Sequence, residues 1–188
     1  ADSTASGLQL LSAMRRDPVG MKYANLLEPE TPSAPPQDAY MRVLEVAKGI
    51  ASKDASLKHL MPYLDYRAIG KPAVMLSVYG GCHQNIKQDI EDAVDAIKEE
   101  LEAQGLQVDK RDMSKLTTLI TNASKQVFPA AYEALSWLKR LAKQAHKDGQ
   151  ESLAWTTPTN DQIHLIKHKI ETIKIYTAFN GTVSIGDF

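Results

Sequence analysis

Three polar side chains recur at helical spacing between residues 67 and 81. Arg67 and Lys71 lie four residues apart, and Tyr79 follows Lys71 by eight. In a helix such steps fall on one side, and eight residues rise about 12 Å. That is about the length of a nucleoside triphosphate from its outer phosphate to its base. Since guanidinium and ammonium groups match phosphate oxygens, the spacing suggests a nucleotide site with a stacking ring at the base end.

The helix that carries these residues has a proline near its expected start. Pro72 suits the first turn of a helix, so we predict a helix over residues 72–80 with Lys71 at its cap and Arg67 before it. Gly80 removes a side chain where a base pair would come close. The alternative is an ordinary surface helix with two basic residues and a glycine stop, since short motifs often mislead.

A carboxylate near the start of the sequence is the second candidate. Asp2 precedes small residues and then a helical pattern, which leaves room for a metal and a substrate beside it. Magnesium in proteins prefers one or two carboxylates together with phosphate oxygens and water. The alternative is that the Asp or Ser residues here only cap a helix.

The elements that must position these residues are mainly helices, with a β-ribbon at the C-terminal end. Apolar residues recur with helical spacing in four stretches, at residues 7–16, 38–50, 84–104 and, broken near Pro129, 113–147. The proline-rich segment EPETPSAPPQD predicts a loop. From Ser152 the pattern becomes β, and Asn180 with the following glycine predicts a hairpin turn. We expect Trp137 and Trp155 to lie in the core.

The composition fits one ordinary domain. The chain has 188 residues, 43% of them hydrophobic and 24% charged, and its net charge of −1 gives no overall basic field that would indicate nucleic-acid binding. The single cysteine, Cys82, excludes a disulfide framework and indicates a reducing compartment. No run of about 18 apolar residues predicts a membrane span. The sequence lacks an initial methionine and ends within a strand pattern, so we expect a piece of a longer protein.

Taken together, the two motif segments resemble a known family. DSTASGLQ, residues 2–9, resembles the first conserved motif of the phage-type single-subunit DNA-directed RNA polymerases, which mitochondrial enzymes share. The second motif of that family, on its fingers helix, resembles Arg67, Lys71, Val74, Met75, Tyr79 and Gly80. Flanking stretches such as SAMRRDPVGMKYANLLEPE, AAYEALSWLKRLAK and LAWTTP match in order, so the resemblance covers nearly the whole chain.

The resemblance implies a role for each matching residue. Asp2 would bind two catalytic Mg²⁺ ions, as in two-metal phosphoryl transfer. Lys71 would contact the incoming triphosphate and protonate the pyrophosphate leaving group, and Arg67 would hold the outer phosphates. Tyr79 would select ribose, and Gly80 would allow close packing at the new base pair. The implied catalytic residues are therefore Asp2, Lys71 and Tyr79.

The resemblance also implies a fold, which is part of the palm and fingers of a right-hand polymerase. Residues 1–60 would form the start of the palm with the first metal-binding motif and a linker. Residues 61–150 would form the fingers helices, and residues 151–188 a β-ribbon that returns to the palm. The second metal-binding Asp of the family belongs to a His-Asp-Ser type motif that does not occur here. We therefore expect it outside this chain, and half an active site within it.

The activity implied for the intact enzyme is templated addition of ribonucleotides to an RNA 3′ end. Its partners would be a DNA template, nascent RNA and ribonucleoside triphosphates, without a membrane, and the enzyme would be monomeric. It would work in the cytoplasm of an infected host cell or, alternatively, in the mitochondrial matrix. Two other functions stay open. One is a family-A DNA polymerase fragment, whose fingers helix shares a Lys followed eight residues later by Tyr-Gly; the other is a non-catalytic helical module that binds nucleic acid.

Residues of the predicted ribbon carry two weaker candidates. His164 and His168 lie four apart, which places them on one face of a strand, but no third zinc ligand has fitting spacing. Lys167, Lys169 and Lys174 could contact a nucleic-acid backbone. A solvated ribbon face is the favoured explanation of these lysines.

Overall fold

The computed structural model describes residues 5–29, 31, 33–107, 109–150, 152–166, 172–177 and 181–186. The chain divides into two compact units, Ala1–Trp137 and Leu138–Phe188. The architecture is mainly helical with small antiparallel sheets, which confirms the predicted class. None of the described helices is both long enough and apolar enough to cross a membrane.

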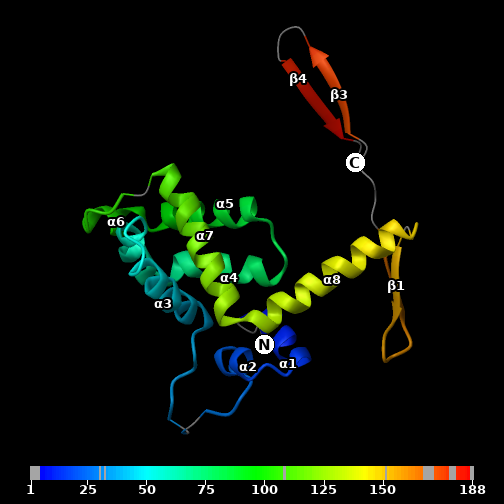
Figure 1. Cartoon of the computed structure of the whole chain (residues 1–188), viewed down its shortest axis with the longest axis horizontal. Coiled ribbons are helices and arrows are strands. Elements are labelled where there is room, and N and C mark those ends of the chain that lie inside the picture. Colours follow the sequence, from blue (N-terminus) through cyan, green and yellow to red (C-terminus); the bar gives the residue numbers. More distant parts are fainter. Residues whose placement is uncertain are drawn as a thin grey trace. The chain divides into compact units, whose positions relative to one another are not determined.

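The first unit is helical (Figure 1). Its elements are α1 (Ser6–Arg15), α2 (Pro18–Tyr23), α3 (Ala39–Ala51), the 3₁₀ helix η1 (Lys58–Asp65), α4 (Arg67–Val78), α5 (His83–Ala96), α6 (Lys98–Ala103), α7 (Lys110–Val127) and the start of α8 (Pro129–Lys147). Three of these helices begin at an aspartate whose carboxylate accepts backbone N–H groups of the first turn, namely Asp17, Asp38 and Asp109. The predicted break near Pro129 is confirmed, because α7 ends and α8 begins there.

The single helix predicted over residues 84–104 is two helices. α5 ends at Ala96, because its C-cap residue Ile97 has a φ of −112° and a ψ of 18°, outside the helical range, and α6 begins at Lys98. The Ile97 N–H donates to the Val94 carbonyl, three residues back, at 3.2 Å, so the last turn tightens as helix ends often do. Gly105 follows α6 with a φ of 72°, in agreement with the predicted stop.

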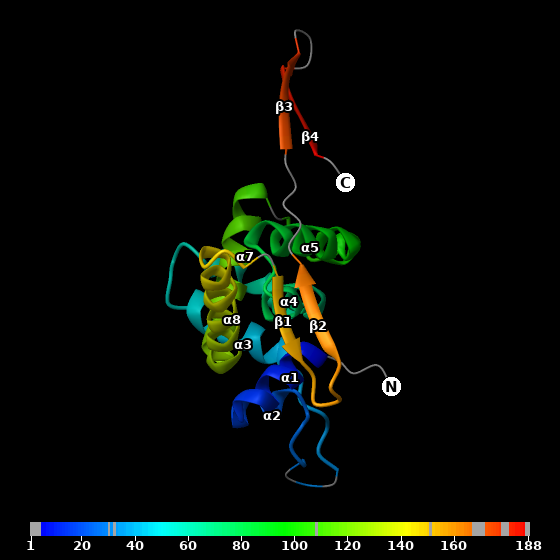
Figure 2. The same ribbon diagram turned by 90° about the vertical axis from the view of Figure 1, so that its right-hand side faces the viewer.

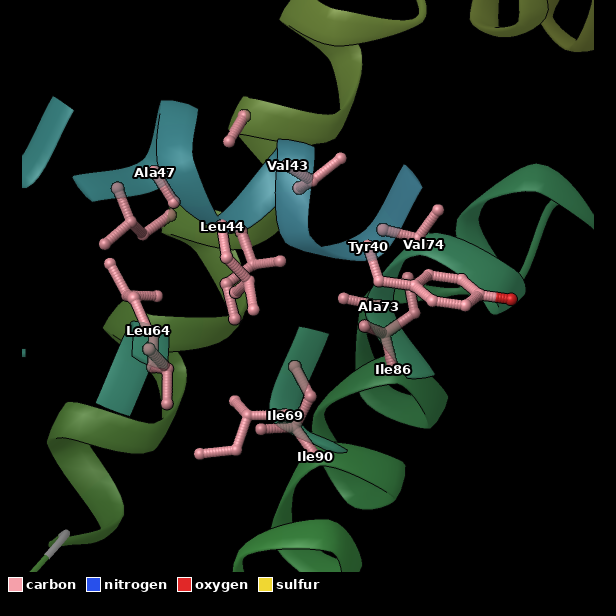
Figure 3. Packing of buried hydrophobic residues seen from close by; sticks show 14 of the residues in the cluster. Tyr40, Val43, Leu44, Ala47, Leu64, Ile69, Ala73, Val74, Ile86 and Ile90 are labelled. Carbon is pink, nitrogen blue, oxygen red and sulfur yellow. The ribbon is translucent and has the colours of Figure 1, made fainter. Parts of the chain in front are cut away.

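Helix α4 lies at the centre of the first unit and packs against α1, α3, α5, α7 and η1. Figure 3 shows Tyr40 and Leu44 of α3 beside the apolar side chains that α4 and α5 contribute to the core. Leu44 is fully buried, and a Cβ atom at Gly70 would lie 2.8 Å from its Cδ1 and Cγ atoms. The bare glycine therefore allows α3 and α4 to approach closely.

The predicted start of α4 is wrong. The helix begins at Arg67, so Pro72 lies inside it and Lys71 is in mid-helix rather than at the cap. Pro72 has no N–H, which leaves the helix one backbone hydrogen bond short and disfavours this position by about 3 kcal/mol. The buried face outweighs that cost, because burying each large apolar side chain contributes roughly 1.5–3 kcal/mol. The residues of this face are Ile69, Gly70, Ala73, Val74, Ser77 and Val78.

The second unit holds the rest of α8 and two hairpins (Figure 2). Strand β1 (Ser152–Thr156) pairs antiparallel with β2 (Gln162–Ile166), and β3 (Thr172–Thr177) pairs antiparallel with β4 (Gly181–Gly186). These pairs confirm the predicted β pattern from Ser152 onward. The predicted turn residue Asn180 lies outside the described residues.

The prediction that both tryptophans lie in the core is wrong. Trp137 is 55% exposed and Trp155 is 50% exposed. In α8 the apolar stripe is buried at Ala131 but exposed at Leu138 and Leu141. Helical periodicity identified the stripe correctly, but periodicity does not say which turns find a covering neighbour.

Candidate functional site

One face of α4 is exposed and carries the three residues whose spacing suggested a nucleotide site. Arg67 and Lys71 lie one turn apart on this face, and Tyr79 is the C-cap residue of the same helix, with 61% of its surface exposed. The structure therefore aligns Arg67 and Lys71 within one helix. Had the helix started at Pro72 as predicted, Arg67 would lie outside the helix and would not share its face with Lys71.

Lys71 carries a cation without a protein partner. Its side chain is exposed, and within the described part of the chain it has no ion pair or hydrogen bond. By contrast, Lys48 pairs with Asp65, and Lys87 pairs with Glu91 at 3.3 Å. The Lys71 ammonium group is thus available to an anion from solution.

Arg67 is held by two residues at the start of α3. Its Nε–H donates to Oδ2 of Asp38 at 2.5 Å, and its Cζ atom lies 4.7 Å from the centre of the Tyr40 ring. The Arg67 side chain is 46% exposed, against 33% for Asp38. Arg67 therefore makes a charge-assisted hydrogen bond to a carboxylate and lies over the face of an aromatic ring.

Asp38 uses both carboxylate oxygens. Oδ1 accepts the N–H groups of Tyr40 at 2.9 Å and Met41 at 3.1 Å, and Oδ2 accepts from Arg67. Burial alone would raise the pKa of Asp38, but the hydrogen bonds from Arg67 and the two amides, together with the positive charge of Arg67, bring it below its ordinary value of 3.8. Asp38 is thus ionised at neutral pH while it both caps α3 and pairs with Arg67.

Tyr40 supplies the ring beneath Arg67. It is only 1% exposed, and its hydroxyl has no hydrogen-bond partner among the residues that the structure describes. Burial raises the pKa of Tyr40, with the charges of Arg67 and Asp38 acting in opposite directions, so the phenol stays neutral in the physiological range.

Tyr79 joins α4 to the first turn of α1. Its hydroxyl accepts the N–H of Gly7 at 3.2 Å and lies 3.1 Å from Oγ of Ser6. A Cβ atom at Gly7 would lie 2.9 Å from the Cε1 and Cζ atoms of the Tyr79 ring, so the ring reaches this amide only because residue 7 is glycine. Two segments that are 72 residues apart in sequence thereby meet.

Gly80 ends α4 by its backbone conformation. Its φ is 78°, in the left-handed region that favours glycine. The Gly80 N–H donates to Ser77 at 3.1 Å, and the Gly81 N–H donates to the Leu76 carbonyl at 2.8 Å, which is the Schellman pattern. The glycine stop is therefore real, whereas the role of Gly80 beside a base pair stays a prediction.

The predicted metal ligands are not brought together by the part of the chain that the structure describes. Asp2 lies outside the described residues, and the described residues contain no group of three or more His, Cys, Asp or Glu side chains that could hold a metal ion. His164 is exposed on β2, and His168 lies outside the described residues. Lys167 and Lys169 also lie outside them, and Lys174 is in β3.

Sequence reasoning missed Asp38 and Tyr40 as partners of Arg67. Asp38 signals a helix start, and that signal was correct. It does not say which cation the second carboxylate oxygen will meet, because the pair spans 29 residues of sequence and forms only when α3 packs on α4. Nothing in the sequence around Tyr40, two residues after Asp38, indicates that its ring will lie under Arg67.

Comparison with known proteins adds to this geometry. Residues 1–185 match the model of a family described as DNA-dependent RNA polymerase. The chain is 31% identical over 189 residues to a DNA-directed RNA polymerase of Pseudomonas phage phiKMV, covering 93% of this chain and 22% of that protein. It is 28% identical over 177 residues to the mitochondrial DNA-directed RNA polymerase of Schizosaccharomyces pombe, covering 85% and 14%. The match to DNA-directed RNA polymerase 1B, mitochondrial, of Nicotiana tabacum is 28% identical over 196 residues, covering 93% and 18%. This chain therefore spans less than a quarter of the length of these three relatives.

Proposed function

Because this chain belongs to the DNA-dependent RNA polymerase family, we propose that it is part of an enzyme that adds ribonucleotides to an RNA 3′ end on a DNA template. The reaction would release pyrophosphate, and the partners would be template, nascent RNA and ribonucleoside triphosphates. One observation carries the proposal. Tyr79 of the second motif contacts Gly7 of the first motif at 3.2 Å, and this contact between the two motif segments supports the proposal that they belong to one site.

Lys71 is the proposed ligand of the incoming triphosphate and the proton donor to pyrophosphate. It is the partnerless cation on the exposed face of α4, within the described residues, and its ammonium group can form charge-assisted hydrogen bonds to phosphate oxygens. Arg67, one turn away, would hold the outer phosphates, since side chains four apart on a helix lie about 5–6 Å from each other at Cβ. Positioning and electrostatic stabilisation of the phosphates would supply most of the rate.

Tyr79 is the proposed sensor of the sugar. Its hydroxyl accepts the Gly7 amide, which leaves the hydroxyl proton to be donated to Ser6 or to a ribose hydroxyl. Its ring is mostly exposed and can lie against the incoming nucleotide. Gly80, directly after it, would leave room for the new base pair.

Two Mg²⁺ ions would neutralise the charge that develops on the phosphates. Asp2 and a second carboxylate would hold them. Within the described residues, the contribution of this chain is therefore phosphate binding by α4 and sugar positioning at the α4–α1 contact.

The wider assignments are part of the same proposal. Residues 1–60 would belong to the palm, 61–150 to the fingers and 151–188 to a ribbon returning to the palm of a single-subunit enzyme. The enzyme would be monomeric, and it would act in the cytoplasm of an infected host cell or, alternatively, in the mitochondrial matrix. The similarity to DNA-directed RNA polymerases favours RNA synthesis over a family-A DNA polymerase.

A chimera tests the proposal. The matching segment of the phage phiKMV polymerase would be replaced by residues 1–188, and extension of an RNA primer on a DNA template would be measured with Mg²⁺ and ribonucleotides. We expect templated extension, and we expect Lys71→Met to lower its rate by about 10–100-fold, since a hydrogen bond to a charged group contributes about 1.5–3 kcal/mol. The matched control is Lys125→Met, which changes an exposed lysine of α7.

Two outcomes would contradict the proposal. One is a folded chimera, judged by circular dichroism and template binding, that adds no nucleotide. The other is a Lys71→Met chimera as fast as the Lys125→Met control.

A further inference from the structure

We propose that Asp38 and Tyr40 are positioning residues that hold the Arg67 guanidinium by one edge and one face, and so present its terminal nitrogens to the phosphates of a nucleoside triphosphate. This inference rests on the proposed function, because it concerns the same phosphate site. It adds two residues of α3 to the residues on α4.

The Nε–H group of Arg67 binds the Asp38 carboxylate, which backbone amides of α3 also bind. Asp38 binds the first-turn amides of α3 through Oδ1 and Arg67 Nε through Oδ2. The carboxylate cannot turn away from Arg67 without giving up the helix cap. Its pairing also favours the ionised form, in agreement with the lowered pKa of Asp38.

The ring beside Arg67 is buried. Tyr40 is 1% exposed, and Figure 3 shows its side chain beside Ala73 and Val74 in the core. The guanidinium lies over this ring at 4.7 Å from the ring centre. A buried ring thus lies against a half-exposed cation, and their cation–π attraction restrains it.

The terminal nitrogens of Arg67 are the groups that would bind phosphate. A guanidinium has five N–H donors in a rigid fork, and the Asp38 contact uses only the one on Nε. The terminal nitrogens have no recorded partner among the described residues, and the side chain is half-exposed one turn from Lys71. Two parallel N–H groups match two phosphate oxygens.

Holding the side chain in place lowers the cost of binding. A free arginine loses much rotamer freedom when it grips a ligand, and a side chain already ordered by the protein loses less. The negative charge of Asp38 opposes a bound phosphate. However, the recorded contact of Asp38 is with Nε and not with the terminal nitrogens, and solvent screens the repulsion because both side chains are partly exposed. Order therefore outweighs repulsion, and loss of Asp38 weakens phosphate binding.

The test measures binding of inorganic tripolyphosphate to the 188-residue chain by titration calorimetry. Asp38→Ala removes both the edge contact and the cap, and we expect affinity to fall about three- to tenfold, the effect of one freed rotamer-rich side chain. Asp38→Asn keeps an acceptor and a good cap, so most of the affinity should return. Asp109→Ala removes an equivalent cap from α7, and among the described residues no arginine side chain pairs with Asp109, so affinity should not change.

A double-mutant cycle separates positioning from a merely structural role. If Asp38 acts through Arg67, the Asp38→Ala change costs nothing further in an Arg67→Ala background. An equal loss in that background, or an unchanged or tighter affinity for Asp38→Ala alone, would overturn the proposal. For the ring, Tyr40→Phe should bind as well as the original chain, whereas a loss equal to that of Tyr40→Leu would contradict the role of the ring face.

A second measurement needs no ligand. The Arg67 Nε–H signal in a ¹⁵N NMR spectrum, assigned by its absence in Arg67→Lys, should be protected in the original chain and in Asp38→Asn but lost in Asp38→Ala. Protection in Asp38→Ala would overturn the proposal. If the original chain binds no tripolyphosphate, the proposed phosphate site fails, while this signal still decides whether Asp38 holds Arg67.

Discussion

The two ends of α4 are fixed in different ways. At the N-terminal end, Arg67 is held by a charged group and a ring, both from α3. At the C-terminal end, Tyr79 is held by a backbone amide of α1 that it can reach only because residue 7 is glycine. Lys71 lies between them and has no partner within the described residues. The phosphate end of the proposed site thus depends on charge, and the sugar end depends on close approach.

This difference implies different sensitivities. Ion pairs between partly exposed groups weaken with salt and with protonation of the acid. A contact made by a neutral hydroxyl and an amide responds to neither, but it is sensitive to any side chain that occupies the space. Both ends also depend on the packing of Leu44 in α3 against Gly70 in α4.

The largest effect on stability is expected from weakening the packing between α3 and α4, on which both ends of α4 depend. Leu44 is fully buried against Gly70 of α4, so Leu44→Ala should leave a cavity and lower the free energy of unfolding by about 2–5 kcal/mol. Urea unfolding followed by circular dichroism measures this change. Leu138→Ala, at a site that is 45% exposed, is the control and should change it by less than about 0.5 kcal/mol. A loss below about 1 kcal/mol for Leu44→Ala would show that α4 does not depend on this contact.

The next effect concerns the sugar end. Tyr79→Phe removes the hydroxyl that meets Gly7 and Ser6 and should cost at most about 0.5–1.5 kcal/mol of stability. In the chimeric enzyme it should reduce the preference for ribonucleotides over deoxyribonucleotides. Gly7→Ala keeps the hydroxyl but puts a Cβ atom 2.9 Å from the ring, so it should reduce the preference in the same direction. Unchanged discrimination in both variants would refute the role of Tyr79.

The smallest effect concerns the phosphate end and depends on pH. The pKa of Asp38 is lowered in the folded chain, so its pairing stabilises the fold above the ordinary value of 3.8 and is lost as pH falls through the folded pKa. At pH 7 the original chain should be more stable than Asp38→Asn by less than about 1 kcal/mol. That gap should close at acidic pH and shrink in 1 M salt, as measured by urea unfolding. A gap that is constant with pH would mean that the carboxylate charge contributes nothing.

The helices could be predicted from sequence more completely than the site. Periodicity located α3, α7 and α8, and the same rule identified the β pattern after Ser152. It failed at the start of α4, because Pro72 is a strong local signal for a first turn and the burial of Ile69 and its neighbours overrides that signal. Local rules cannot weigh a tertiary contact that forms only after folding.

The site shows the same limit. Spacing alone suggests that Arg67 and Lys71 share a helix face, because four residues make about one helical turn. The start predicted at Pro72 left Arg67 outside the helix, whereas α4 begins at Arg67 and contains both. The partners of Arg67 and Tyr79 lie 29 and 72 residues away, and no spacing rule reaches that far. The resemblance to the polymerase motifs joined residues 2–9 to α4, but only packing shows that the Gly7 amide is the contact.

The most direct test is to titrate Mg²⁺ and ATP into the ¹⁵N-labelled chain and to follow its backbone amide signals by NMR. Our account predicts chemical-shift changes concentrated in Arg67–Gly81 and in the first turn of α1, with larger changes near Tyr79 for ATP than for dATP. Changes confined to other elements such as the β1–β2 hairpin, or no changes at all, would contradict the assignment of α4 as the nucleotide-binding helix.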